Sequence, residues 1–132
     1  MKLGIPVYQD VNLMDVTGPI EMFTWVPKHL GLEYYIVSED GLPVTSVNGV
    51  RFFADKSFSQ LPELDVLWVP GGKPSKLEEI MSDPNSAYLA YIKQTAATAD
   101  WICSVCEGAL LATKAGILDG HKATTHWAFQ TV

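Results

Sequence analysis

The segment WICSVCEGALLATKAG, residues 101–116, changes its pattern in the middle. Its first part, Trp101–Val105, is rich in β-branched and aromatic residues, as is typical of a buried strand. Its second part, Ala109–Ala115, consists of small and helix-forming residues, and Gly116 follows where a helix commonly ends. Only Cys-Glu-Gly at 106–108 separates the two parts. The segment therefore predicts a strand, a sharp turn that carries Cys106, and a helix.

The rest of the chain alternates strands and helices in the same way. Helices are expected from Asp15 to about Leu30, closed by a glycine, and from Asp83 to about Thr98. The expected strands are 3–7, 33–38 and 64–69, and a hairpin is expected over 44–53, around its Asn-Gly pair. This order predicts an α/β fold: a doubly wound, mostly parallel sheet, a flavodoxin-like sandwich with a nucleophile elbow at 106–108.

The last residues predict a short strand at 121–125 and a helix that begins at His126. A helix that stops without a cap or an apolar partner is unusual. We therefore expect a single domain, residues 1–132, that lacks its C-terminal elements.

The composition excludes several classes of partner. With 132 residues and 48% apolar side chains, the chain can bury the core of one domain. A net charge of −6 disfavours nucleic acid and anionic membranes, which would repel the surface, and favours a small-molecule substrate. No apolar run approaches the roughly 18 residues of a membrane helix, and no signal peptide is evident. We expect a cytoplasmic protein.

The two cysteines, Cys103 and Cys106, form a Cys-x-x-Cys pair. A structural disulfide is disfavoured in the cytoplasm, and two cysteines without neighbouring histidines or further cysteines make a poor zinc site. A redox pair at the start of a helix stays open as an alternative.

Cys106 is the first candidate for chemistry. Ligands of open α/β sheets bind at the carboxyl ends of the strands, where Cys106 is expected. Unpaired N–H groups and the dipole at the start of the following helix favour a thiolate, so we expect a lowered pKa for Cys106. Gly108 would allow close packing beneath the turn. The alternative is that Cys106 is one more small buried residue.

Further candidate groups follow other predicted strands. Asp15 follows the first strand among apolar residues and could hold a proton near neutral pH, although an ordinary helix N-cap is the alternative. Glu21 is a weaker candidate for that role. The backbone N–H groups of Gly72 and Glu107 could stabilise an oxyanion, with Gly71 beside them. His126 could orient the cysteine or the substrate, or be structural.

Four motifs together carry a resemblance to a known family. In chain order they are MDVTGPIEMF, LDVLWVPGG, SVCEGALLATKAGILDG and ATTHW. They resemble the ThiJ/PfpI family of the class I glutamine amidotransferase-like superfamily, and within it the isonitrile hydratases most of all. The same motifs also occur in domains of AraC-type transcription regulators. They therefore mark a branch of the family, which contains more than one activity.

The resemblance implies a mechanism. Cys106 would be the nucleophile and Asp15 the acid that contacts it and shuttles a proton. Thiolate attack on the terminal carbon of an isocyanide would give a thioimidate-like intermediate, and water would release an N-substituted formamide. One of the two groups must be ionised and the other protonated, because adjacent anions raise each other's pKa. The resemblance implies no metal or organic cofactor, and a homodimer.

The chain departs from the hydratase pattern in two places. Glu107 stands where that pattern has threonine, and its negative charge would oppose thiolate formation unless the side chain points to solvent or to a neighbouring subunit. The family also continues past ATTHW with a glycine-rich strand and a helix.

Two other functions stay open. The first is a glyoxalase or deglycase acting on 2-oxoaldehydes, although those relatives carry glutamate where this chain has Asp15. The second is a non-catalytic sensor in which Cys106 is oxidised to a sulfenic or sulfinic state.

Overall fold

The computed structural model describes residues 1–130 of the chain. The strands are β1 (Lys2–Pro6), β2 (Glu33–Ser38), β3 (Val44–Thr45), β4 (Arg51–Phe52), β5 (Lys56–Ser57), β6 (Val66–Val69) and β7 (Trp101–Ser104). The α-helices are α1 (Leu13–Thr24), α2 (Pro74–Ser82), α3 (Ala87–Ala96) and α4 (Gly108–Lys114). Three short 3₁₀ turns cover Lys28–Leu30, Phe58–Gln60 and Trp127–Phe129.

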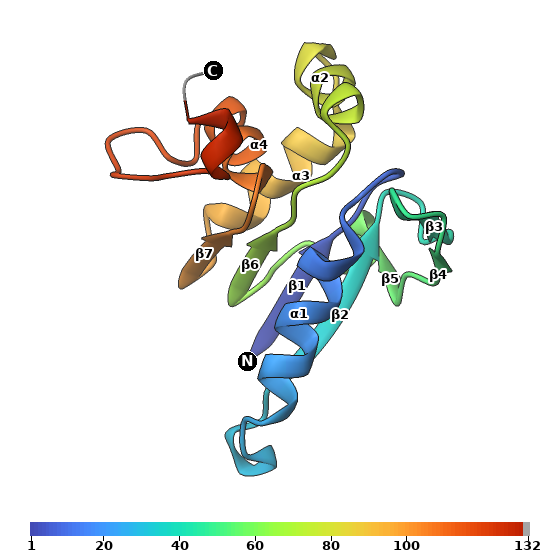
Figure 1. The fold of residues 1–132 in the computed structure, drawn as a ribbon. Helices are drawn as coiled ribbons and strands as arrows, with labels where there is room; N and C mark the ends of the chain where they lie inside the picture. The colour runs from blue at the N-terminus through green and yellow to red at the C-terminus, as the bar shows by residue number, and fades with distance from the viewer. Residues whose placement is uncertain (131–132) are drawn as a thin grey trace.

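The central sheet is parallel and has the strand order β5-β2-β1-β6-β7. The chain moves outward from β1 to β2 through α1, and returns to the other side of β1 to form β6 and β7. Helix α1 lies in front of the sheet in Figure 1, and α3 lies behind it. The carboxyl ends of β1, β6 and β7 therefore meet at one edge. The predicted doubly wound α/β sheet is confirmed.

The core is centred on β1 and β6. Leu3 and Ile5 of β1 and Leu67 and Val69 of β6 are completely buried, as central strands of a parallel sheet require. Each such aliphatic side chain contributes about 1.5–3 kcal/mol of hydrophobic stabilisation. This rigid centre holds the carboxyl ends of the strands in fixed positions.

The strand β7, which was expected to be buried, forms an edge of the sheet described here. Its Trp101 is 65% exposed.

Helix α1 is shorter than expected. It ends at Thr24 instead of about Leu30, and only a 3₁₀ turn, closed by Gly31 at φ 63°, follows. The reason is Pro27, which has no N–H group and disfavours helical backbone in the residue before it.

The region between β6 and β7 contains two helices where one was expected. Helix α2 was missed because Leu77 and Ile80 are its only buried residues, too few for a clear apolar periodicity. Asp83 ends α2, so the helix that was expected to begin at Asp83 begins only at Ala87. Ser86 caps α3 instead, with its hydroxyl accepting from the N–H of Leu89 at 3.2 Å.

Two smaller elements also differ from expectation. The hairpin of β3 and β4 is confirmed, with Gly49 at φ 82°, whereas the edge strand β5 was not foreseen. Residues 121–125 form no strand, and the hydroxyl of Thr125 donates to the backbone oxygen of Cys106. The helix expected from His126 is only a 3₁₀ turn as far as Gln130, and its last two residues lie outside the described ones.

Within residues 1–130, none of the helices combines the length and the apolar character that crossing a membrane demands.

Candidate active site

Cys106 lies on a sharp turn between β7 and α4. Its φ of 49° is in the left-handed region, which costs a residue other than glycine about 1–3 kcal/mol. The turn is fixed on both sides, because the N–H of Val105 donates to Val69 O at 3.1 Å and the N–H of Gly108 donates to Val105 O at 2.9 Å. A Cβ at Gly108 would collide with the backbone carbonyl of Val69. The geometry is that of the predicted elbow, and Gly108 is required for it.

Asp15 reaches Cys106 across 91 positions of sequence. The Cys106 thiol donates to Asp15 Oδ1, with Sγ and Oδ1 3.3 Å apart. The other carboxylate oxygen, Oδ2, accepts from the N–H of Gly71 at 2.9 Å. The indole N–H of Trp68 donates to the backbone oxygen of Asp15 at 3.0 Å. The acid is 6% exposed and held on three sides, so one oxygen is kept facing the sulfur.

Asp15 is not the N-cap of α1, so that alternative interpretation is wrong. The cap position is Asn12, which no sequence pattern indicated as part of the site. Its amide Nδ2 donates to Asp15 Oδ2 at 3.4 Å and to Glu107 Oε2 at 3.2 Å.

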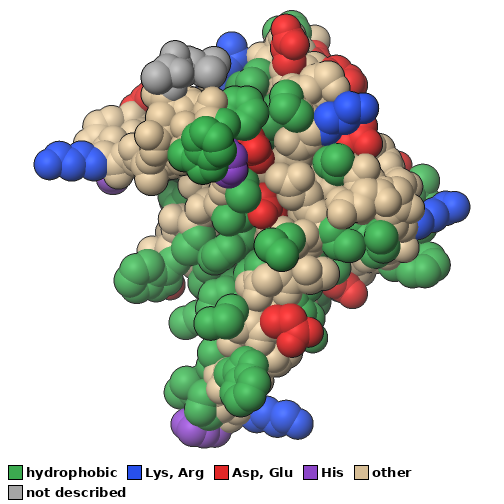
Figure 2. Space-filling view, in the orientation of Figure 1, with side chains coloured by type: hydrophobic (Ala, Val, Ile, Leu, Met, Phe, Trp, Pro, Cys, Tyr) green, Lys and Arg blue, Asp and Glu red, His purple; other side chains and the backbone are tan. Residues whose placement is uncertain are grey.

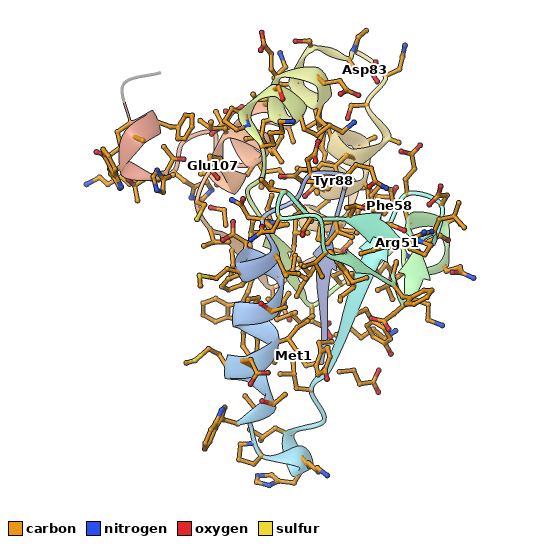
Figure 3. All side chains as sticks on the ribbon, turned by 45° about the vertical axis from the view of Figure 1, so that its right-hand side comes forward. Met1, Arg51, Phe58, Asp83, Tyr88 and Glu107 are labelled. Atoms are coloured by element: carbon orange, nitrogen blue, oxygen red, sulfur yellow. The ribbon has the colours of Figure 1, made fainter. Side chains whose placement is uncertain are left out.

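Glu107 points into the site and not to solvent. Its side chain is 8% exposed, at the point where α4 meets the carboxyl ends of the strands (Figure 3). Cys106 Sγ and one carboxylate oxygen each from Asp15 and Glu107 lie within 4.8 Å of one another. Donors of this kind could hold a metal ion; that the reaction needs none stays a prediction.

The thiol of Cys106 is strongly held in its protonated form. Burial, the hydrogen bond to Asp15, and the negative charges of Asp15 and Glu107 raise the pKa of Cys106 to about 12. The expected lowering of this pKa by the helix start is therefore wrong, because burial first, and then the two carboxyl groups, raise it.

The two glycines of the β6–α2 loop have different surroundings. The N–H of Gly71 is used by Asp15, so Gly71 orients the acid. Gly72 packs tightly, since a Cβ there would come within 2.8 Å of the Tyr8 ring. A Cβ at Gly71 would come within 2.9 Å of the nitrogen of Glu107, so this loop lies directly against the elbow. The oxyanion role of the N–H groups of Gly72 and Glu107 stays a prediction.

His126 contacts the elbow through its backbone. Its N–H donates to Cys106 O at 3.3 Å, while its Nδ1 accepts from the N–H of Ala128. The hydroxyl of Thr125, which the sequence analysis did not single out, donates to the same oxygen at 2.9 Å. Residues 125–126 therefore hold the cysteine backbone, and the imidazole turns toward its own 3₁₀ turn.

The remaining candidates lie apart from this group. Glu21 is exposed on α1. Cys103 is half-buried in β7, against the core, and only burial raises its pKa. Both cysteines are free thiols, and Cys103 is in a strand, whereas a redox pair would place its first cysteine at the start of a helix.

Known proteins resemble this chain over nearly its whole length. The model of the DJ-1/PfpI family matches residues 1–132. An isonitrile hydratase of Pseudomonas putida is 35% identical over 98% of this chain, which spans 54% of that protein. An uncharacterized protein from the cpoL 5' region of Streptomyces lividans is 36% identical over 96% of the chain and 87% of its own length.

Solved structures resemble the fold of this chain. A ThiJ/PfpI family protein from Pseudomonas syringae superposes with a TM-score of 0.84 and 36% identity, over 96% of this chain and 50% of its own. Oxidized DJ-1 of Toxoplasma gondii superposes with a TM-score of 0.77 and 26% identity, over 97% of this chain and 68% of its own. The chain thus spans about half the length of the hydratase and of the bacterial structure. From the family match over its whole length, the chain belongs to the DJ-1/PfpI family.

Proposed function

We propose that this chain is the catalytic part of a cofactor-free hydratase that converts an isocyanide to an N-substituted formamide. One observation carries the proposal: Cys106 Sγ and Asp15 Oδ1 share a hydrogen bond at 3.3 Å on a turn whose backbone is fixed. The 35% identity to an isonitrile hydratase supports this choice of substrate.

The raised pKa of Cys106 fits this chemistry if the thiol and the acid are treated as a pair. When Asp15 is ionised, the proton stays on sulfur, as the pKa of about 12 indicates. Transfer of that proton along the hydrogen bond gives a thiolate and a neutral carboxylic acid without any change in total charge. That arrangement supplies a nucleophile and a proton donor together.

Each step then balances. Asp15 gives its proton to the terminal carbon of the isocyanide while Cys106 Sγ forms a bond to the same carbon, which yields a thioimidate. Water adds to this carbon, and its extra proton passes through Asp15 to the substrate nitrogen. The carbon–sulfur bond breaks, the formamide leaves, and the site again holds one proton.

We also propose that the protein works as a homodimer. Hydrophobic side chains gather along α1 and the segment after it (Figure 2). Met14 is 81% exposed and Trp25 is 85% exposed. Contact with a second copy would cover such side chains. Light scattering at several protein concentrations tests this, and a monomer at all of them would contradict it.

The decisive experiment identifies the product. The protein is incubated with a simple alkyl isocyanide, and proton NMR follows the formyl hydrogen. We expect formamide from the wild type and none above background from Cys106→Ala and Asp15→Ala. Lactate from methylglyoxal without any formamide would favour the glyoxalase alternative. If neither product forms but peroxide adds oxygen to Cys106, the sensor alternative replaces the proposal.

A further inference from the structure

Asn12 occupies an N-cap position but does not cap its helix. An asparagine at this position normally accepts a hydrogen bond from an N–H of the first turn, and the Asn12 side chain makes no such bond. Its amide donates instead to the carboxylates of Glu107 and Asp15, at 3.2 and 3.4 Å. Because both partners are acceptors, only the NH₂ group can face them. The backbone N–H of Asn12 donates to Gly71 O at 2.9 Å, which fixes the residue in place.

This amide joins two acidic side chains that come from different ends of the chain. Asn12 and Glu107 are 95 positions apart. Gly71 leaves the space in which they meet, since a Cβ there would collide with the Glu107 carboxylate and come within 3.0 Å of Asp15 Oδ2. A glutamate at the start of a helix has free routes to solvent, so its burial requires a partner. Asn12 is that partner.

The other groups around the sulfur do not neutralise this charge. Tyr8, which follows β1, has a pKa raised by burial and then by Asp15 and Glu107, and its hydroxyl donates to Pro70 O at 3.1 Å. The His126 imidazole accepts from its own turn. In residues 1–130, no lysine, arginine or histidine forms a salt bridge with Asp15 or Glu107.

We propose that Asn12 is a positioning residue that locks the Glu107 carboxyl group beside Asp15, so that two acids, not one, control when the Cys106 sulfur becomes reactive. The inference rests on the proposed role of Cys106 and adds a regulator of the same site. Glu107 acts on the sulfur through its charge, and Asn12 acts through Glu107.

The test uses alkylation, which requires no substrate. All variants carry Cys103→Ser, so that iodoacetamide reacts with Cys106 alone, and the rate is measured between pH 7 and 10.5. Glu107→Gln keeps the shape and an acceptor for Asn12 but removes the charge. Asn12→Ser keeps a good N-cap residue that is too short to bridge the acids. Glu78→Gln, the same change on the exposed side of α2, is the matched control.

We expect Glu107→Gln to raise the alkylation rate at pH 8 about tenfold, the effect of a pKa lower by about one unit. Asn12→Ser should raise it about threefold, because the released glutamate can turn to solvent, and should add little to Glu107→Gln in the double variant. Glu78→Gln should leave the profile unchanged.

Three results would overturn the proposal: no shift in Glu107→Gln, no shift in Asn12→Ser, or an equal effect of Asn12→Ser with and without Glu107. Circular dichroism establishes that each variant is folded. If Asn12→Ser does not fold, Asn12→Thr is measured in its place. Absence of formamide in the wild type would remove the proposed substrate and leave the alkylation result standing, so the two failures are distinguishable.

Discussion

Cys103 and Cys106 are three positions apart and have the same side chain, yet they lie in different surroundings. Cys103 is in the strand β7 and packs against the core, and burial alone raises its pKa. Cys106 follows the end of that strand on a left-handed turn, beside two carboxyl groups that add to the effect of burial. The comparison shows that a cysteine becomes a candidate nucleophile through its position at the carboxyl ends of the strands, and not through its residue type. Cys103 is therefore an internal control.

The largest effect on activity is expected from replacing Cys106, and a much smaller one from replacing Cys103. Cys106→Ser should reduce formamide production to the background rate, because a serine hydroxyl beside Asp15 is a far weaker nucleophile than a thiolate. Cys103→Ser should keep most of the wild-type rate, since its sulfur only packs in the strand. Initial rates of both variants check this. Loss of activity in Cys103→Ser with the fold intact would instead favour redox exchange between the pair.

Replacing Asp15 should lower the rate of hydration and raise the rate of Cys106 alkylation. Asp15→Asn takes away a negative charge and a proton carrier, so hydration should fall by about 10²–10⁴-fold. The pKa of Cys106 should fall from about 12, so alkylation between pH 8 and 10 should become faster. In the wild type the alkylation rate should rise about tenfold per pH unit over this range. A decrease of both rates would mean that Asp15 only supports the fold.

The backbone of the elbow is tested by Gly108→Ala. The added Cβ meets the carbonyl of Val69, so the free energy of unfolding should fall by about 1–3 kcal/mol. Gly18→Ala is the matched control, because a Cβ at that position in α1 meets nothing within 4 Å. It should stabilise the protein by about 0.5–1 kcal/mol. Urea unfolding of both variants measures the difference, and equal midpoints would contradict the account of the turn.

The smallest effect is expected at Thr125. Thr125→Val removes a donor to Cys106 O at 2.9 Å but leaves the N–H of His126 on the same oxygen. The cost should be about 0.5–1.5 kcal/mol of stability. Thermal unfolding tests this, and a change beyond about 3 kcal/mol would show that the segment does more than hold the turn.

Much of this arrangement was predictable from local patterns. The strand, turn and helix around Cys106 follow from the change of pattern at 106–108, and the parallel sheet follows from alternating apolar strands and helices. Asp15 was identified because an acid directly after a buried strand must lie at the same edge as Cys106. The end of α1 before Pro27 was predictable too, but the apolar spacing up to Leu30 obscured it.

The chemistry of the site was less accessible from the sequence. Burial and Asp15 raise the pKa of Cys106, and Glu107 adds to this effect because its carboxylate turns inward, where it accepts from Asn12 in the space at Gly71. No local pattern encodes a contact across 95 positions. The hydrogen bond of Thr125 was missed for a similar reason, because its segment was expected to pair as a strand.

The most direct test locates the covalent bond. The protein is mixed with an alkyl isocyanide, quenched during turnover and digested with trypsin, and the peptide of residues 94–114, which contains both cysteines, is fragmented in a mass spectrometer. The account predicts a mass increase equal to one isocyanide on Cys106 and none on Cys103. An adduct on Cys103, or steady formamide production in a Cys106→Ala protein, would contradict it.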